Sequence, residues 1–204
     1  MRARDVMTRS VVAVEPATLV KEAAELLVKY GFTTLPVADE DGRLVGVVTE
    51  ADLLRDRIGV DPRSLVHPDW PVRSGGAPAP TVGAVMTTEV VFRGPNADAA
   101  ELARVMLDKH LRAIPIVDAK LLVGIVTRRD LLRTIARDDQ AITRDVRHHL
   151  ARCFRRGDWS AAVEASVVTL VDEFGDESER HIATVIASAV PGVVDVKVVT
   201  PAGK

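Results

Sequence analysis

Two short segments of the chain combine a hydroxyl and a carboxylate at the same spacing. Each has a threonine three residues before an aspartate, directly after an apolar run: Thr49 with Asp52, and Thr127 with Asp130. Where a strand gives way to a helix, the first backbone N–H groups are unpaired and partly positive, which suits a phosphate. The threonine hydroxyl can donate to a phosphate oxygen, and the carboxylate can accept from two neighbouring sugar hydroxyls. The alternative is structural, with the aspartates capping helices and the threonines ending strands.

The two segments belong to an internal repeat. Met7-Thr8 recurs 79 residues later as Met86-Thr87. The same offset relates two pairs of prolines, and an offset of 78 relates the motif residues and the Leu-Leu-Arg that follows them: Pro16 and Pro95, Pro36 and Pro115, Gly46 and Gly124, Thr49 and Thr127, Asp52 and Asp130, 53–55 and 131–133. The missing residue falls in a turn, where 39–42 correspond to the shorter 118–120, because turns tolerate changes of length.

Each copy has the pattern of a β-α-β-β-α unit. Short strands are predicted at 11–14 and 90–92, followed by amphipathic helices at 18–30 and 99–109, the second with Asp98 at its start. Strands at 34–38 and 44–49 flank Asp41-Gly42, which is a strong hairpin signal. A further helix begins at Asp52 or Asp130. Residues 61–80 hold five of the eleven prolines, which predicts an extended linker that Trp70 pins to the body of the protein.

With this architecture the sequence resembles a tandem pair of CBS domains. The resemblance is carried by residues 5–8, 35–37 and 46–52 in the first copy and by 84–87, 114–116 and 124–130 in the second. One Gly-x-x-Thr-x-x-Asp motif is weak evidence, whereas two copies behind matching apolar-Pro-apolar strands are specific. The resemblance covers residues 1–136 and implies an α/β (α+β) fold. In that fold repeat 1 (1–60) and repeat 2 (81–136) pack as a pseudo-two-fold pair.

The resemblance also implies two clefts that bind adenosine nucleotides (AMP, ADP or ATP) or related adenosyl compounds. Each cleft would join the Thr–Asp motif of one copy to the first strand and the apolar-Pro strand of the other. The members of cleft one would be Met7, Val12, Phe32, Thr33, Ile125, Thr127 and Asp130. The members of cleft two would be Val47, Thr49, Asp52, Met86, Val91, Leu111 and Arg112. The apolar members would sandwich the adenine, although core packing explains any one of them equally well.

The two motifs differ in charge. Arg128 and Arg129 stand in the second motif where the first has Glu50 and an alanine, and Arg112 occupies the position of Thr33 in the other copy. Arginine suits bidentate phosphate binding, so Arg128 and Arg129 are candidate phosphate ligands of cleft one and Arg112 is the candidate of cleft two, with solvated arginines as the alternative. Because Glu50 would repel a phosphate in cleft two, unless Arg112 offsets it, we expect tighter nucleotide binding in cleft one.

Residues 137–204 form a second region with the predicted order α-β-β-α-β. Its first helix has an apolar face made of Ile142, Val146, His149, Leu150 and Cys153. Strands follow at 159–164 and 167–171, then a helix at 178–190 and a last strand at 193–200. The segments 167–170, 179–183 and 190–196 resemble a BON domain, although Ser166 and Asp172 stand where that family usually has glycine. The resemblance implies a module that binds another macromolecule. Without an export signal we expect a protein-interaction or output role.

Composition excludes several classes of protein. The net charge is -2 and aromatic residues make up 3% of the chain, which argues against a nucleic-acid-binding surface. The apolar run at 11–14 is too short for a signal peptide, and none approaches the ~20 residues of a membrane span, so we expect a cytoplasmic protein with no transmembrane segment. His149 and Cys153 are one helical turn apart, but their place on the apolar face favours buried packing over a metal site.

The sequence shows no catalytic constellation. It has no Gly-x-Ser-x-Gly and no Gly-rich lysine loop, so we expect no enzymatic activity. The leading hypothesis is a regulatory sensor of adenosine nucleotides in which the BON-like region interacts with a protein partner. The alternatives are a structural or scaffold protein with non-binding clefts and a regulatory subunit that acts through protein–protein contacts. Leucines on the helices that begin at Asp52 and Asp130 predict a homodimer.

Overall fold

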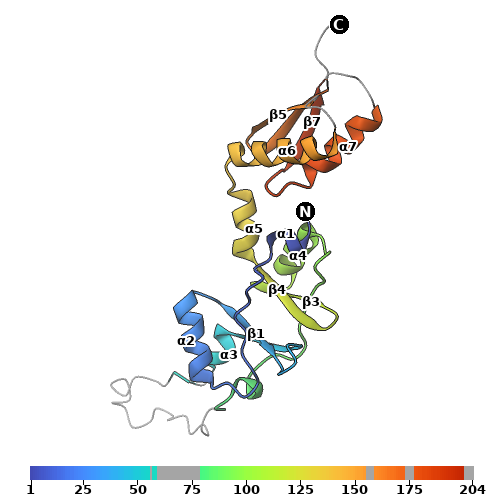
Figure 1. The fold of residues 1–204 in the computed structure, drawn as a ribbon. Helices are drawn as coiled ribbons and strands as arrows, with labels where there is room; N and C mark the ends of the chain where they lie inside the picture. The colour runs from blue at the N-terminus through green and yellow to red at the C-terminus, as the bar shows by residue number, and fades with distance from the viewer. Residues whose placement is uncertain (56, 59–78, 155–158, 173–176, 200–204) are drawn as a thin grey trace, which may run out of the picture. The chain divides into compact units, whose positions relative to one another are not determined.

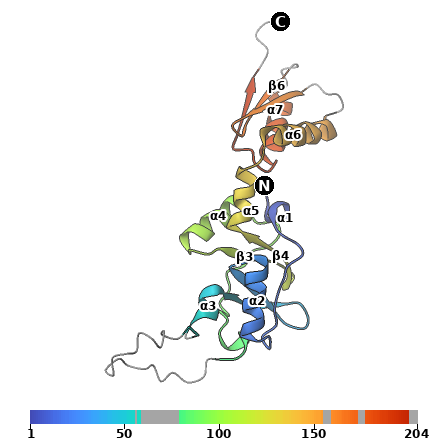
Figure 2. The same cartoon turned by 90° about the vertical axis from the view of Figure 1, so that its left-hand side faces the viewer.

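The computed structural model describes residues 1–55, 57–58, 79–154, 159–172 and 177–199 (Figures 1 and 2). Its elements in chain order are α1 (Ala3–Val6), α2 (Val20–Tyr30), β1 (Thr34–Ala38), β2 (Leu44–Thr49), α3 (Glu50–Leu54), η2 (Val82–Ala84), α4 (Ala99–Asp108), β3 (Ala113–Asp118), β4 (Leu121–Thr127), α5 (Arg128–Ile135), α6 (Asp139–Cys153), β5 (Trp159–Glu164), β6 (Val167–Asp172), α7 (Glu177–Ser188) and β7 (Asp195–Val199). Helices and strands interleave, as the predicted α/β class requires.

The chain divides into two compact units. Unit 1 holds residues 1–7, 96–109 and 126–204, and unit 2 holds residues 8–95 and 110–125. Each sequence repeat therefore contributes residues to both units.

The first hairpin of unit 2 forms where the sequence predicts it. Strand β1 pairs antiparallel with β2, from Thr34 opposite Thr49 to Ala38 opposite Leu44. In the turn, Gly42 has a φ of +76°, which a residue with a side chain rarely adopts. The Asp39 carboxylate accepts a hydrogen bond from the N–H of Arg43 at 2.8 Å. Strands β3 and β4 form a second two-stranded sheet.

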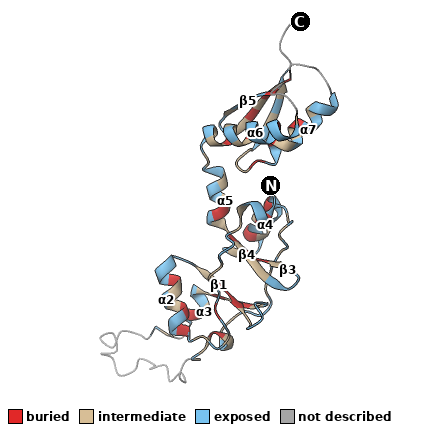
Figure 3. Cartoon of the chain, in the orientation of Figure 1, coloured by how far each residue is buried: buried red, intermediate tan, exposed pale blue. Residues whose placement is uncertain are grey.

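Helix α2 covers the core of unit 2 with its apolar face (Figure 3). The buried residues of this core come from α2, β1, β2, α3 and η2 and from Val14: Val14, Val20, Ala23, Leu27, Leu35, Val37, Val48, Leu53 and Val82. The helix begins two residues later than predicted. Thr18 is not helical because its hydroxyl accepts the N–H of Glu15 at 3.0 Å, and the N–H of Leu19 donates to the Glu22 carboxylate at 3.1 Å.

The threonine of each Met-Thr pair forms an antiparallel bridge with a strand of the other repeat. Val47 and Thr87 exchange two backbone hydrogen bonds of 2.9 Å, and Thr8 and Ile125 exchange two of 2.9 and 3.0 Å. Both exchanges lie within unit 2. They bring residues of the two repeats, far apart in sequence, to the same strands.

The predicted strands at 11–14 and 90–92 are wrong. In place of each strand there is one isolated parallel bridge: Val14 with Val37 at the end of the first segment, and Arg93 with Ile116 directly after the second. A proline follows each bridge residue by two positions and has no N–H with which to continue a ladder. Most of the predicted linker, including Trp70, lies outside the described residues.

Helices α4 and α5 of unit 1 start at side-chain caps. The Asp98 carboxylate accepts the N–H of Ala100 at 2.8 Å, so the predicted start of α4 is confirmed. At the start of α5 the Arg128 guanidinium donates to the Met106 carbonyl at 2.7 Å. This bond ties the last turns of α4 to the first turn of α5.

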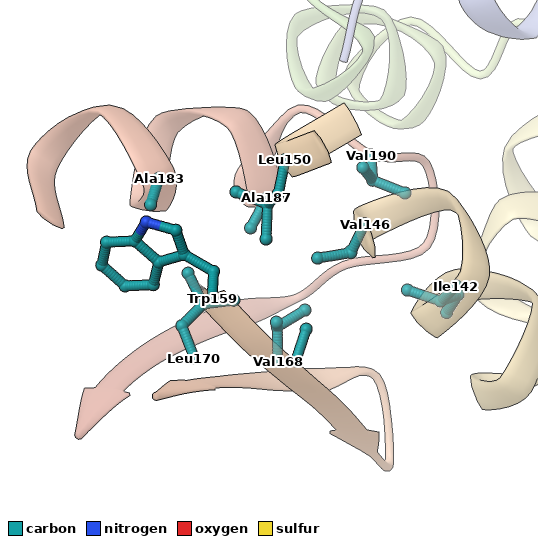
Figure 4. Close-up of a cluster of buried hydrophobic side chains, with 10 residues drawn as sticks. Ile142, Val146, Leu150, Trp159, Val168, Leu170, Ala183, Ala187 and Val190 are labelled. Atoms are coloured by element: carbon teal, nitrogen blue, oxygen red, sulfur yellow. The ribbon is translucent and has the colours of Figure 1, made fainter. Parts of the chain in front are cut away.

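The carboxyl-terminal region has the predicted α-β-β-α-β order. Strand β6 is central, antiparallel to β5 and parallel to β7. Figure 4 shows its core, in which side chains of α6 and α7 meet those of the sheet. The buried members are Ile142, Val146, Leu150, Trp159, Ala161, Val168, Leu170, Ala183, Ala187 and Val190.

The buried stripe of α6 is narrower than the sequence suggests. Ile142, Val146 and Leu150 are buried, whereas His149 and Cys153 are exposed. The predicted buried packing of these two side chains is therefore wrong. Each follows a buried residue by three positions, which turns it about 60° away from the stripe.

Candidate functional site

The two Thr–Asp motifs fold into the same local structure. Thr49 is the N-cap of α3: its hydroxyl accepts the N–H of Asp52 at 3.4 Å, and the Asp52 carboxylate accepts the N–H and the hydroxyl of Thr49 at 2.9 and 2.7 Å. Thr127 and Asp130 repeat this capping box at the start of α5, with distances of 3.2, 2.9 and 2.6 Å. A capping box satisfies two orphan N–H groups of a helix start. The capping alternative therefore describes the local structure of both motifs.

The caps use one carboxylate oxygen of each aspartate and leave the other to an arginine. Oδ1 of Asp130 lies 3.1 Å from Arg133, and Oδ1 of Asp52 lies 3.8 Å from Arg55. The Asp130 side chain is only 8% exposed, whereas both arginines are largely exposed. Oδ1 is thus the atom with which either aspartate can accept hydroxyls of a ligand.

Unit 2 contains a pocket of about 350 Å³. Its walls come from the start of β1, the β2–α3 junction, the segment after Met86 and the start of β3: Thr33, Thr34, Val47, Thr49, Glu50, Ala51, Thr87, Glu89, Val90, Val91, His110, Leu111, Arg112, Ala113 and Pro115. Both repeats contribute, because Thr87 pairs with Val47 across them. The volume lies at the lower end of the roughly 300–1,000 Å³ that small-molecule sites occupy.

The pocket gathers most of the residues predicted for cleft two. Five of the seven line it: Val47, Thr49, Val91, Leu111 and Arg112. Asp52 does not line it, since its carboxylate is turned into the α3 cap. Met86 does not line it either. Its Sδ would lie 2.7 Å from a Cβ added at Gly46, so the side chain packs directly on the strand backbone.

Several lining residues of the pocket differ from the sequence prediction. Thr33 lines it although the prediction placed Thr33 in cleft one, because the Thr33 carbonyl accepts the N–H of Glu50 at 3.3 Å. Glu89 and His110 line it and were missed. The available signal was position: Glu89 follows the Met-Thr of the second repeat by two residues, and His110 precedes the predicted Leu111.

The predicted members of cleft one are divided between the units. Met7, Thr127, Arg128, Arg129 and Asp130 belong to unit 1, while Val12, Phe32, Thr33 and Ile125 belong to unit 2. Within unit 1, the Arg128 guanidinium is bound to the Met106 carbonyl and Arg129 is exposed. Within unit 2, Phe32 stacks on Tyr30 with ring centroids 5.3 Å apart. Cleft one as a whole stays a prediction.

The pocket has an ion pair on its wall. Nη1 of Arg112 lies 3.1 Å from Oε2 of Glu50, with side chains that are 63% and 48% exposed. The pair joins the start of β3 to the start of α3, across 62 positions of sequence. Arg112, the predicted phosphate partner of this cleft, is therefore already bound to the carboxylate that was expected to repel a phosphate.

Comparison with known proteins identifies the family. The sequence profile of the CBS domain matches residues 3–59 and 82–137, which is more than half of the chain. The protein belongs to the CBS-domain family, and its two matched segments form a tandem pair. Families of this kind are generally regulatory rather than catalytic.

Several curated proteins are similar over part or most of the chain. An uncharacterized protein of Methanocaldococcus jannaschii, MJ1404, is 30% identical over 193 residues, which cover 91% of this chain and 39% of MJ1404. A protein of Thermofilum pendens is 33% identical over 58% of this chain and 34% of its own length. The CBS domain-containing protein YhcV of Bacillus subtilis is 33% identical over 63% of this chain and 81% of YhcV. The chain thus spans between a third and two fifths of the first two relatives.

Solved structures share the fold of the CBS pair. CBSX2 in complex with AMP is 34% identical, with a TM-score of 0.51, and the match covers 65% of this chain and 93% of CBSX2. The CBS domain pair of MJ0100, in complex with 5′-methylthioadenosine and S-adenosyl-L-methionine, is 25% identical, with a TM-score of 0.51, over 65% of this chain and 98% of that pair.

Among the helices described in this chain, none is long and apolar enough to cross a membrane.

Proposed function

We propose that this chain is a regulatory sensor that binds an adenosine-type ligand in the pocket of unit 2. The observation that carries the proposal is the pocket itself, a small cavity built from both repeats and lined by five residues expected there. AMP, 5′-methylthioadenosine and S-adenosylmethionine, which are bound by CBSX2 and MJ0100, have adenosine in common. The similarity to these proteins therefore supports a ligand that contains adenosine.

The pocket walls suit the parts of adenosine. Aliphatic surface for the faces of the base comes from Val47, Val91 and Leu111. Two residues with hydroxyl groups, Thr33 and Thr49, line the same pocket. A few placed polar groups in a mostly apolar pocket are typical of small-molecule sites. Asp52 does not line the pocket, so in our proposal its Oδ1, which the α3 cap does not use and which lies 3.8 Å from Arg55, turns to the ribose hydroxyls when the ligand binds. Cleft one, with Thr127 and Asp130, is proposed as a second site of the same kind.

We propose that residues 137–204 form the output module, of the BON type, and that α5 connects it to the CBS pair. The helix begins at the Thr127–Asp130 box and ends against the module. The Arg137 guanidinium, just after α5, donates to the Pro191 carbonyl at 2.7 Å and pairs with Asp145 on α6. If the ligand binds more tightly to the conformation with α5 in one position than to the other, its binding shifts the equilibrium towards that conformation and so moves the module. We place the protein in the cytoplasm, as a homodimer with a protein partner.

Calorimetric titration of the full-length chain with adenosine, AMP, ADP, ATP, 5′-methylthioadenosine and S-adenosylmethionine tests the proposal. At least one should bind, and at 100 times its dissociation constant it should stabilise the fold by about 2.7 kcal/mol in a thermal-shift assay. Val91→Trp fills the pocket and should abolish the binding event that belongs to it.

The matched control is Val28→Trp on α2, where the side chain is 84% exposed and is not among the residues that line the pocket. It should leave binding intact. Binding of none of the six compounds would overturn the proposal and favour the scaffold alternative. Equal binding by Val91→Trp and the wild type would show that the pocket is not the site.

A further inference from the structure

The pocket of unit 2 carries more negative than positive charge on its walls. Its ionisable lining residues are Glu50, Glu89, His110 and Arg112. Apart from His110, the described lining carries two carboxylates and one guanidinium. The positive charge is held by Glu50, whose carboxylate lies 3.1 Å from the Arg112 guanidinium.

A phosphate would meet this wall at a disadvantage. To bind Arg112 it must displace the Glu50 carboxylate, which then remains beside it in the same pocket. Like charges a few ångströms apart repel, and the repulsion grows as the surroundings lose water. An uncharged or cationic substituent on the 5′ carbon of the sugar meets no such repulsion.

Comparison of the two repeats shows that only the first Thr–Asp motif has an acidic residue at this position. The residue after the motif threonine is Glu50 in the first repeat and Arg128 in the second. Both positions are the first residue of a helix that a capping box fixes. The cap places the Glu50 backbone beside the pocket, and its side chain then decides the local charge.

We infer that Glu50 determines which class of adenosine compound this pocket binds, and that it selects nucleosides without a negative 5′ substituent over nucleoside phosphates. The inference rests on the proposed function, since it presumes an adenosine-type ligand in this pocket. Arg112 is the counter-ion of Glu50 rather than a phosphate ligand. Adenosine and 5′-methylthioadenosine should bind more tightly than AMP, and AMP more tightly than ADP.

The test is Glu50→Gln in the full-length protein, titrated with 5′-methylthioadenosine, AMP and ADP. The substitution keeps the shape of the side chain, removes the repelling charge and releases Arg112 to a phosphate. AMP affinity should rise about three- to tenfold and ADP affinity at least as much, as expected for partly exposed charges, while 5′-methylthioadenosine affinity should change less than about twofold. The gain should shrink as salt is raised from 0.05 to 0.5 M. Arg112→Gln, which leaves Glu50 unpaired, should weaken AMP and spare 5′-methylthioadenosine.

Two comparisons keep the result interpretable. Titration of Val91→Trp, in which the pocket is filled, shows which part of the binding heat comes from this pocket. The charge control is Glu40→Gln, at an exposed turn position in the same unit, which should leave all three affinities unchanged. If no compound binds the wild type, the proposed function itself fails. If 5′-methylthioadenosine and AMP bind the pocket equally in the wild type, or if Glu50→Gln leaves their ratio unchanged, the inference about Glu50 is overturned while the proposed function stands.

Discussion

Gly192 lies so close to the carbonyl oxygen of Thr134 that no side chain fits between them. A Cβ at Gly192 would be 2.9 Å from that oxygen and 2.9 Å from Cδ1 of Ile142, and the residue has a φ of +96°. Thr134 is in the last turn of α5, and Ile142 is the first buried residue of α6. The turn before β7 is therefore pressed against the helix that begins at the Thr127–Asp130 box.

Gly192→Ala should lower the free energy of unfolding by about 2–4 kcal/mol, because it combines a strained backbone with a collision in a packed region. Urea denaturation followed by circular dichroism measures the change. Gly42→Ala is the matched control: its φ is +76°, but no atom of the described residues lies within 4 Å of the added Cβ. It should cost only the backbone strain, about 1 kcal/mol. Equal effects of the two substitutions would contradict the collision.

Asp139→Ala should destabilise the carboxyl-terminal region. The Asp139 carboxylate, at the start of α6, accepts the N–H groups of Ala165 and Ser166 at 2.8 and 3.0 Å. Both turn residues have positive φ, 49° and 64°, so the turn depends on this support. Loss of two hydrogen bonds to a charged group should cost about 2–4 kcal/mol. Thermal unfolding measures it, and Asp138→Ala, whose side chain makes no cap bond to α6, should have little effect.

Asp130→Ala should weaken nucleotide binding more than Asp52→Ala, most clearly for di- and triphosphates. The reason is charge: Arg129 accompanies Asp130 in its motif, whereas Glu50 accompanies Asp52. Removal of an acceptor of ribose hydroxyls should cost about 1–3 kcal/mol of binding free energy. Calorimetric affinities and stoichiometries of the two variants decide the order. Unchanged affinity in Asp130→Ala would remove the case for a site at that motif.

The exposed apolar residues of α5 predict self-association. Leu132 and Ile135 are 62% and 67% exposed, and residues three positions apart share one face of a helix. Association of two copies through this face would remove its apolar surface from water. Leu132→Glu should convert a dimer to a monomer at micromolar concentration, as light scattering can measure. Val194→Glu, at an apolar position before β7 that is 74% exposed, should leave the mass unchanged. A monomeric wild type would contradict the prediction.

The sequence by itself determined the features that depend on near neighbours. The Thr-x-x-Asp spacing predicts a helix start after each strand, and each capping box closes over three residues. Asp41-Gly42 predicts the β1–β2 turn for the same reason, since a two-residue signal is enough to reverse the chain. The resemblance to CBS domains, carried by the repeated motifs, also implied which segments of the two copies would meet, and five of the seven residues predicted for cleft two line one pocket.

Only the tertiary structure decided which side chains share a surface. Composition did not show that Arg112 would pair with Glu50 across 62 positions, that Thr33 would join Thr49 in one pocket, or that His149 and Cys153 would be exposed. Each depends on how the strands and helices pack against one another. That packing is determined by the sum of many weak contacts over the whole unit. Local sequence patterns predict hydrogen bonds between residues that are close in sequence. The charge of a pocket, in contrast, is the sum of the charges on residues that the fold brings together from distant positions.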